Sequence, residues 1–256
     1  MYHDTSSHTF DVRLATTAAD VHAAQALRYD VFVDEGGASG GLIDHDARRE
    51  VDPFDAHADH LLLFDNSLPA DSRVVGTYRL MTRQHAMAAG GFYSATEFDV
   101  TAMLNSDLSI LELGRSCLRK PYRGGTALMH LWRGVGRYVA EEKTDLLFGV
   151  ASFRGTDPST HAHALSYLHH EYLADVALRP VVQGESAINM NILPKDAVER
   201  RTALTQLPAL IKAYLRLGGV VGDGAFVDRA FNTIDVCLML EAGRLSARQR
   251  AFYEAA

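Results

Sequence analysis

Glu112 and Arg115 are the residues whose types and setting are best suited to chemistry. Both interrupt the apolar, strand-like run that begins at Asp107, where charged side chains are costly unless they are paired or used. Gly114 permits a β-bulge that would turn both side chains to one side and expose backbone N–H groups. Such a kink could seat a thioester carbonyl, because exposed N–H donors stabilise a developing oxyanion. The alternative is an ion pair within the sheet or at its rim.

An acidic set precedes this run in the sequence. Glu50, Asp52 and Asp55 follow the pattern E-x-D-x-x-D, and carboxylates this close together suit a cationic amine or, in principle, a divalent metal. Taken alone, such a pattern is more often a solvated acidic loop.

Three further residues could join the acidic set. Arg28 lies one turn before Phe32 on an expected helix, so the two can share a face. Arg79 interrupts the apolar run VVGTYRLM. A lone Arg at either place is usually a surface residue, but together with the acidic set these residues predict a charge network near the loop.

Basic residues concentrate just after Glu112. No Asp or Glu occurs between Glu112 and Glu141, whereas six basic residues do: Arg115, Arg119, Lys120, Arg123, Arg133 and Arg137. In a chain of net charge −7, this stretch predicts a docking surface for a phosphate-bearing or acidic partner. The turn Arg123-Gly124-Gly125-Thr126 could cradle a pyrophosphate or a phosphopantetheine arm at a helix N-terminus. A tight strand-to-helix connection would explain it equally well.

The elements that must position these residues follow from hydrophobic spacing. One domain over residues 1–256 is expected, with a mixed sheet and flanking helices. The expected strands are 12–14, 60–64, 73–81, the run beginning at 107, 146–151 and 233–240. The expected helices are 20–35 with Thr17 near its N-cap, 126–141 with Leu128, Leu131, Val135 and Val139 buried, one beginning at Asp157-Pro158, and 207–217. Residues 92–103 are irregular or helical, and Asn232, Thr233 and Asp235 are polar core or pocket wall.

Composition narrows the function classes. A hydrophobic content of 47% and the absence of a signal peptide or a run of roughly 20 apolar residues predict a cytoplasmic protein. Cys117 and Cys237 lie in apolar runs and are expected to be free structural thiols. The acidic balance argues against nucleic-acid binding. The histidines show no H-E-x-x-H pattern, so no metal site is expected, and no G-x-S-x-G or P-loop motif occurs.

The order of the charged motifs resembles that of the acyl-homoserine lactone synthases. In sequence order the chain presents Arg28 and Phe32, the E-x-D-x-x-D set, Arg79 within GTYRLM, and Glu112 and Arg115 within ELGR. This resemblance implies the GNAT acyltransferase fold and an acyl carrier protein as acyl donor. The chain lacks the Trp that the synthases place after Phe32.

From Leu14 to Leu240 the chain resembles the ornithine lipid acyltransferases, a GNAT branch. The matching segments are LELGRSCLRKPYRGG, SFRGTDP with ALSYLHHEYLA, LPALIKAYLRLGG and DRAFNTIDVCLML. The pyrophosphate signature R-x-x-G-x-G/A is only partly met, because Thr126 and Leu128 stand where glycines are typical. That departure favours an acyl carrier protein over free CoA.

The resemblance implies transfer of a 3-hydroxyacyl chain from acyl carrier protein to the α-amine of ornithine, giving lyso-ornithine lipid without a permanently bound cofactor. Glu112 would be the general base acting through a water. The implied substrate-binding residues are Arg28, Phe32, Glu50, Asp52, Asp55, Arg79 and Arg115. The implied donor-binding residues are Arg119, Lys120, Arg123, Gly124, Gly125, Thr126, Arg133 and Arg137.

Three alternatives stay open. Glutamine or another amino acid could replace ornithine as acceptor, or the product could be an acyl-homoserine lactone. The chain could also be a membrane-surface binding protein that uses the amphipathic segment 207–217. Peripheral contact with the inner face of the membrane is compatible with catalysis, because the implied product is a single-chain amphiphile.

Overall fold

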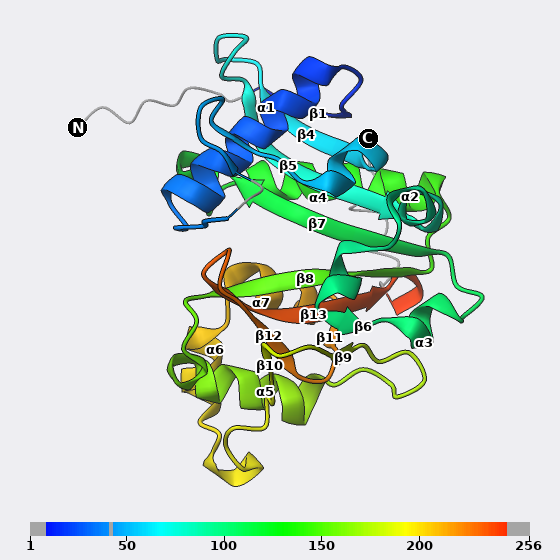
Figure 1. Cartoon of the computed structure of the whole chain (residues 1–256), viewed down its shortest axis with the longest axis vertical. Helices are drawn as coiled ribbons and strands as arrows, with labels where there is room; N and C mark the ends of the chain where they lie inside the picture. Colours follow the sequence, from blue (N-terminus) through cyan, green and yellow to red (C-terminus); the bar gives the residue numbers. More distant parts are fainter. Residues whose placement is uncertain (1–8, 41–42, 245–256) are drawn as a thin grey trace.

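A mixed sheet of nine strands runs through the described part of the molecule, residues 9–40 and 43–244 of the computed structural model (Figure 1). The strand order is β1-β4-β5-β7-β8-β13-β12-β10, and β11 pairs with β13. Within these residues the ladder of β7 with β8 is parallel and the other ladders of the sheet are antiparallel, apart from isolated parallel bridges. The bounds are β1 Phe10–Leu14, β4 Asp59–Asp65, β5 Val74–Thr82, β7 Ile110–Leu118, β8 Leu146–Arg154, β10 Ala187–Ile188, β11 Val220–Val221, β12 Ala225–Asp228 and β13 Thr233–Glu241. The predicted mixed sheet is confirmed.

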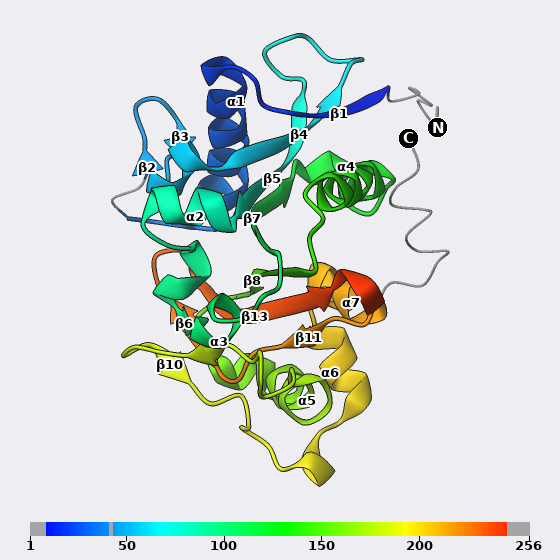
Figure 2. The same cartoon turned by 90° about the vertical axis from the view of Figure 1, so that its right-hand side faces the viewer.

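Helices cover both faces of this sheet. Their bounds are α1 Ala18–Arg28, α2 Arg83–Ala89, α3 Thr101–Leu104, α4 Ala127–Glu141, α5 Ala162–Tyr172, α6 Arg200–Gln206 and α7 Ala209–Arg216. In Figure 2, α1 and α4 lie on opposite sides of the strands β4, β5 and β7, which both helices contact. Two short ribbons complete the fold: β2 Ile43–Asp44 with β3 Arg49–Glu50, and β6 Phe98–Asp99 with β9 Val181–Val182.

Most predicted elements are confirmed. Thr17 caps α1 by accepting a hydrogen bond from the Asp20 N–H at 3.1 Å, and the chain then continues as a π-helix over Tyr29–Asp34. The ambiguous residues 92–103 form a 3₁₀ turn at Tyr93–Thr96, then β6 and α3. We call residues 93–96 the Tyr93 turn.

Helix α4 packs on a different stripe from the one predicted. Leu131 and Val135 are buried as expected, but Leu128 and Val139 are only half-buried. The reason is Gly134, where an added Cβ would lie 2.5 Å from Val12 Cγ1. The helix therefore approaches β1 most closely along its small residue, which rotates the buried stripe toward Gly134.

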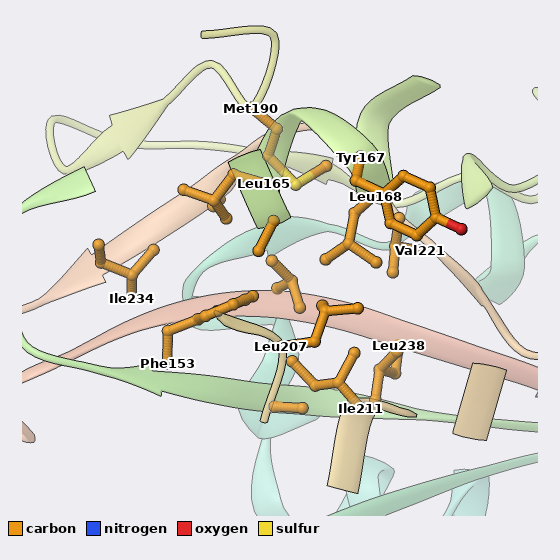
Figure 3. Packing of buried hydrophobic residues seen from close by; sticks show 14 of the residues in the cluster. Phe153, Leu165, Tyr167, Leu168, Met190, Leu207, Ile211, Val221, Ile234 and Leu238 are labelled. Carbon is orange, nitrogen blue, oxygen red and sulfur yellow. The ribbon is translucent and has the colours of Figure 1, made fainter. Parts of the chain in front are cut away.

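The half of the sheet around β13 has its own apolar core (Figure 3). Phe153, Ile234 and Leu238 project from β8 and β13 toward Leu165 of α5. Ile211 of α7 is fully buried in the same cluster. The amphipathic segment 207–217 therefore directs apolar side chains into the protein core.

No helix among the described residues has the length and apolarity to cross a membrane.

Candidate active site

Strands β7 and β8 separate along their length, and this separation organises the site (Figure 1). Their parallel ladder joins residues 110–112 to residues 146–148 and does not continue. On its other edge β7 carries a register shift opposite Thr77–Arg79, and Arg115 has a φ of 50°. A positive φ is uncommon for a residue with a Cβ, so the predicted bulge is confirmed, with Arg115 as its distorted residue.

Gly149 marks the point at which the two strands still touch. A Cβ added at Gly149 would lie 2.2 Å from the carbonyl oxygen of Leu113, which is too close for any side chain. Glycine thus lets the backbones meet there, just before they separate.

A cavity of about 240 Å³ lies beside the separated strands; we call it the site cavity. Its wall includes Phe32, Tyr93, Arg115, Val150 and Asp235. A narrower cavity of about 40 Å³ shares Ser116, Val150, Ala151 and Leu210 with it and is otherwise mostly apolar. The space between β7 and β8 is therefore bordered by an apolar pocket and by a pocket that contains charged groups.

Behind Arg115 lies a compact set of buried charges, the arginine–carboxylate network, formed by Arg28, Arg79, Arg115, Glu50, Asp52 and Asp55. Arg28 Nε lies 2.6 Å from Glu50 Oε2, and its terminal nitrogens lie 2.6 and 2.8 Å from the oxygens of Asp55. Arg79 Nη1 lies 2.8 Å from Asp52 Oδ2, and Arg115 contacts Asp52 and Glu50. The predicted charge network is confirmed, and its three cations balance its three anions.

Burial and pairing give this network its electrostatic character. Arg28, Glu50 and Arg79 are at most 1% exposed. Burial alone raises the pKa of the Asp55 carboxyl, but the hydrogen bonds and charge of Arg28 outweigh burial and hold that pKa well below its usual range. The solvated-loop alternative for the acidic set is therefore wrong, and each of these carboxylates already has an arginine partner.

Glu112 faces the Tyr93 turn. Its carboxylate accepts hydrogen bonds from the backbone N–H of Ser94 at 2.6 Å and of Tyr93 at 3.1 Å, and the residue is 2% exposed. Arg115 stacks on the Tyr93 ring with 4.4 Å between Cζ and the ring centre. The two residues thus reach the same turn, as the predicted bulge requires, but only Arg115 lines the site cavity.

Some of the basic residues after Glu112 form hydrogen bonds or ion pairs with the protein, whereas the turn that follows them is exposed. Arg119 donates to the carbonyls of Ser72 and Val74 at 3.0 and 3.3 Å, Arg123 pairs with Glu35 at 2.7 Å, and Arg137 donates to the Val12 carbonyl at 3.2 Å. Arg133 is half-buried. Lys120, Gly124, Gly125 and Thr126 are exposed, and Thr126 begins α4 without a side-chain cap. Of the residues predicted to form a docking surface, those of this turn are exposed, and the docking role itself stays a prediction.

Asp235, expected with Asn232 and Thr233 to be polar core or pocket wall, lines the site cavity together with both. Sequence reasoning did not connect it with two further carboxylates, Glu97 and Asp228. Glu97 follows the Tyr93 turn, Asp228 ends β12, and Asp235 lies in β13. One carboxylate oxygen from each lies within 4.8 Å of the others; we call these residues the acidic trio. The sequence pointed to Asp235, because it is a charged residue in an otherwise apolar strand. Burying an unpaired charge there costs free energy, as it does at Glu112.

The two cysteines are buried and free, as predicted. Burial raises the pKa of the Cys117 thiol to about 12, so at neutral pH it is protonated and a poor nucleophile. A covalent acyl-cysteine intermediate is therefore not supported.

Comparisons with known proteins identify what the chain is similar to. Residues 27–133 match the family described as acetyltransferase (GNAT) domain. An L-ornithine N(alpha)-acyltransferase of Rhodobacter capsulatus is 46% identical, covering 96% of this chain and 95% of the relative. A protein of the same name from Brucella abortus is 43% identical, covering 96% of this chain and 89% of the relative.

A solved structure agrees at the level of the fold. A CoA-dependent acyl-homoserine lactone synthase, determined with SAM and isopentyl-CoA, superposes with a TM-score of 0.52 at 15% identity, covering 96% of this chain and 88% of the synthase. The GNAT fold implied by the sequence resemblance is thus confirmed, and the chain is an acyltransferase.

Proposed function

Because the chain belongs to the family of L-ornithine N(alpha)-acyltransferases, we propose that it transfers a 3-hydroxyacyl group from acyl carrier protein to the α-amine of ornithine, forming lyso-ornithine lipid. The observation that carries this proposal is the separation of β7 from β8 with a cavity beside it. A thioester requires a narrow slot with backbone donors, and an amino-acid acceptor requires an adjoining pocket with charged groups. The end of the β7–β8 ladder and the cavity lined by Arg115 and Asp235 support these two requirements.

The strand edges that face each other beyond the last ladder pair supply the chemistry. Backbone N–H groups outside a ladder can donate to the thioester oxygen, and they stabilise it more as it becomes an oxyanion. The neutral α-amine attacks the carbonyl carbon, forming the C–N bond. The C–S bond then breaks, the phosphopantetheine sulfur leaves as a thiolate and takes up a proton, and the amide nitrogen loses one.

The arginine–carboxylate network positions the cavity wall in this scheme. Arg28 connects α1 to the acidic loop, and Asp52 holds Arg115 against the Tyr93 ring. Because each network carboxylate already has an arginine partner, we assign Glu50, Asp52 and Asp55 to ordering the loop rather than to holding the ornithine ammonium. Arg115, which lines the cavity together with Phe32, is the proposed partner of the ornithine carboxylate.

Glu112 keeps its proposed role as general base, with an added condition. Both of its oxygens accept backbone N–H bonds, so it would take the amine proton through a water. We expect Glu112→Gln to lower kcat by about 100-fold or more with little change in donor KM. If the melting temperature falls while kcat stays near the wild-type value, Glu112 only holds the Tyr93 turn.

On the donor side, we propose that the phosphopantetheine phosphate lies at the exposed turn Gly124–Thr126, where the first N–H groups of α4 have no intrahelical partner. Lys120 lies nearby in the sequence and is exposed, which suits an encounter with an acidic carrier protein.

One assay tests the proposed function directly. Purified protein is incubated with 3-hydroxyacyl carrier protein or the matching acyl-CoA, and with ornithine, glutamine or S-adenosylmethionine as acceptor. Products are identified by mass spectrometry, with fragmentation that separates α- from δ-acylation. We expect α-acylornithine from the carrier-bound donor. Preferential acylation of glutamine or formation of a lactone would overturn the assignment of the acceptor, and equal use of acyl-CoA would overturn that of the donor.

A further inference from the structure

Unlike the arginine–carboxylate network, the acidic trio forms no ion pair with an Arg or Lys among the described residues. Asp235 is 3% exposed, lines the site cavity, and has an oxygen, Oδ1, without a hydrogen-bond partner among the described residues. Glu97 is equally buried, and its Oε2 has no partner in the same set. The charge of Arg115 acts to lower the pKa of both carboxyls, but the guanidinium of Arg115 already contacts Glu50 and Asp52.

The strand register explains why these carboxylates converge. Asp235 pairs with Phe226 and Asp228 pairs with Thr233 across the antiparallel β12–β13 ladder, so the two aspartates are diagonal neighbours on one face of the sheet. On the opposite face Ile234 and Val236 pack in the apolar core. Glu97 reaches the pair from the end of the Tyr93 turn, which Glu112 holds.

Uncompensated carboxylates at this depth are unfavourable unless a cation joins them. The trio presents one oxygen from each of three residues, and a primary ammonium has three N–H donors to match them. Mg²⁺ or Ca²⁺ would need six or more oxygens, whereas aromatic rings of Tyr93 and Phe231 border this end of the cavity.

We infer that the acidic trio Glu97–Asp228–Asp235 binds the side-chain ammonium of the acceptor and thereby selects a diamino acid over a neutral one. This inference rests on the proposed function and gives it a specificity site. A neutral acceptor such as glutamine would leave the buried charges unmatched, and a side chain ending in a methyl group would offer no donor at all.

The test compares ornithine with norvaline, which has the same carbon chain without the δ-amine. For the wild-type protein with 3-hydroxyacyl carrier protein, we expect kcat/KM to favour ornithine by at least about 100-fold. In Asp235→Asn and Glu97→Gln this preference should fall below about tenfold, because ornithine turnover drops while norvaline turnover is kept. Asp196→Asn, an exposed carboxylate on another segment, should leave the preference unchanged.

Thermal unfolding provides a second measurement. Ornithine should raise the melting temperature of the wild type but not of the two variants, and the variants alone should be at least as stable as the wild type, because each removes a carboxyl group whose ionisation is disfavoured by burial. A purely structural role for the trio would instead lower the melting temperature of both variants.

The remaining outcomes would overturn the inference. An equal loss with both acceptors would assign the trio to the reaction of the α-amine and overturn the inference, as would a preference that persists in both variants. Loss of wild-type activity with a chelator, restored by Mg²⁺ or Mn²⁺, would make the trio a metal site. A wild type that acylates neither acceptor would overturn the proposed function itself, and the inference with it.

Discussion

Asp55 and Glu97 are both buried carboxyl residues, and their neighbours give them opposite properties. Asp55 accepts hydrogen bonds from Arg28 and from Gln25, which hold its pKa low. Burial, followed by the charge of Asp235, raises the pKa of Glu97 to about 9. Burial likewise raises the pKa of Asp235 to about 6. At the scale of residues, the arginine–carboxylate network stabilises the fold. Burial of the acidic trio instead costs free energy, which a bound cation would offset.

Asp55→Asn tests the supporting role. Removing this carboxylate leaves Arg28 buried with part of its charge unmatched, so the free energy of unfolding should fall by about 3–5 kcal/mol. Asp30→Asn is the matched control, because Asp30 pairs with Arg48 at a site where both side chains are about half exposed; its effect should stay below about 1 kcal/mol. Urea unfolding of the three proteins measures both. Equal effects would mean that burial does not strengthen the network.

Glu97 should also make stability depend on pH. Its pKa of about 9 in the folded protein exceeds the unfolded value of about 4.3, so between these values the folded state binds more protons and its stability falls as pH rises. Relative to wild type, Glu97→Gln should therefore gain up to roughly 1 kcal/mol per pH unit between pH 6 and 8. Urea unfolding at several pH values measures this difference, and a difference independent of pH would contradict it.

At the scale of elements, the separation of β7 and β8 depends on where each strand can no longer keep its ladder. The bulge at Arg115 bends β7, while Gly149 lets β8 touch Leu113 at the last point of contact. The Tyr93 turn lies against this opening and is held by Glu112. The opening therefore follows from the backbone conformation of the two strands, and no lid has to move to form it.

Gly149→Ala should disturb that geometry. The added methyl group meets the Leu113 carbonyl at 2.2 Å, so the strands must shift, with a loss of about 1–3 kcal/mol in the free energy of unfolding. We expect kcat to fall more than donor KM rises, because the thioester seat moves. Gly243→Ala makes the same change where an added Cβ has no neighbour within 4 Å, and it should leave stability and kcat unaltered. Wild-type kinetics in Gly149→Ala would contradict this account.

At the scale of the whole molecule, exposed basic residues lie on the turn before α4. Of the acidic trio, Glu97 and Asp235 are buried, Asp228 is half-buried, and Asp235 lines the site cavity. An acidic carrier and a cationic acceptor are thus expected to approach different parts of the protein. The expectation of one domain over residues 1–256, of a cytoplasmic location and of peripheral membrane contact stays a prediction. The terminal residues on which part of it depends lie outside the described ranges.

Lys120→Glu tests the carrier surface better than Arg119→Glu, because Arg119 also holds the carbonyls of Ser72 and Val74. We expect donor KM to rise about three- to tenfold for the carrier-bound donor, more at low salt, with kcat little changed. KM for an acyl-pantetheine without carrier protein should not move. Arg201→Glu, an exposed reversal on α6 in the lower half of Figure 1, is the control. Equal effects of the two reversals would exclude a local docking surface.

Much of the fold could be predicted because hydrophobic spacing reports local structure directly. The hairpin of β4 and β5, helix α4 and the final strand were predicted within a few residues, and the charged residues in apolar runs pointed to the site. The shift of the buried stripe of α4 away from Leu128 and Val139 could not be predicted, because it depends on how closely Gly134 approaches Val12. The balance of charges in the network was equally hidden, since its six members come from segments far apart in the chain.

By itself the sequence determined which residues had to be paired or used. Glu112, Arg115 and Asp235 interrupt apolar strands, and burial makes an unmatched charge costly whatever the fold. Only the tertiary structure decided how each was matched. It pairs Glu50, Asp52 and Asp55 with three arginines, and it brings Glu97, Asp228 and Asp235 together with no arginine paired to them in the part of the chain that the structure describes. The physical reason is that Coulomb interactions depend on distance in space and on burial, and the spacing of residues along the chain gives neither.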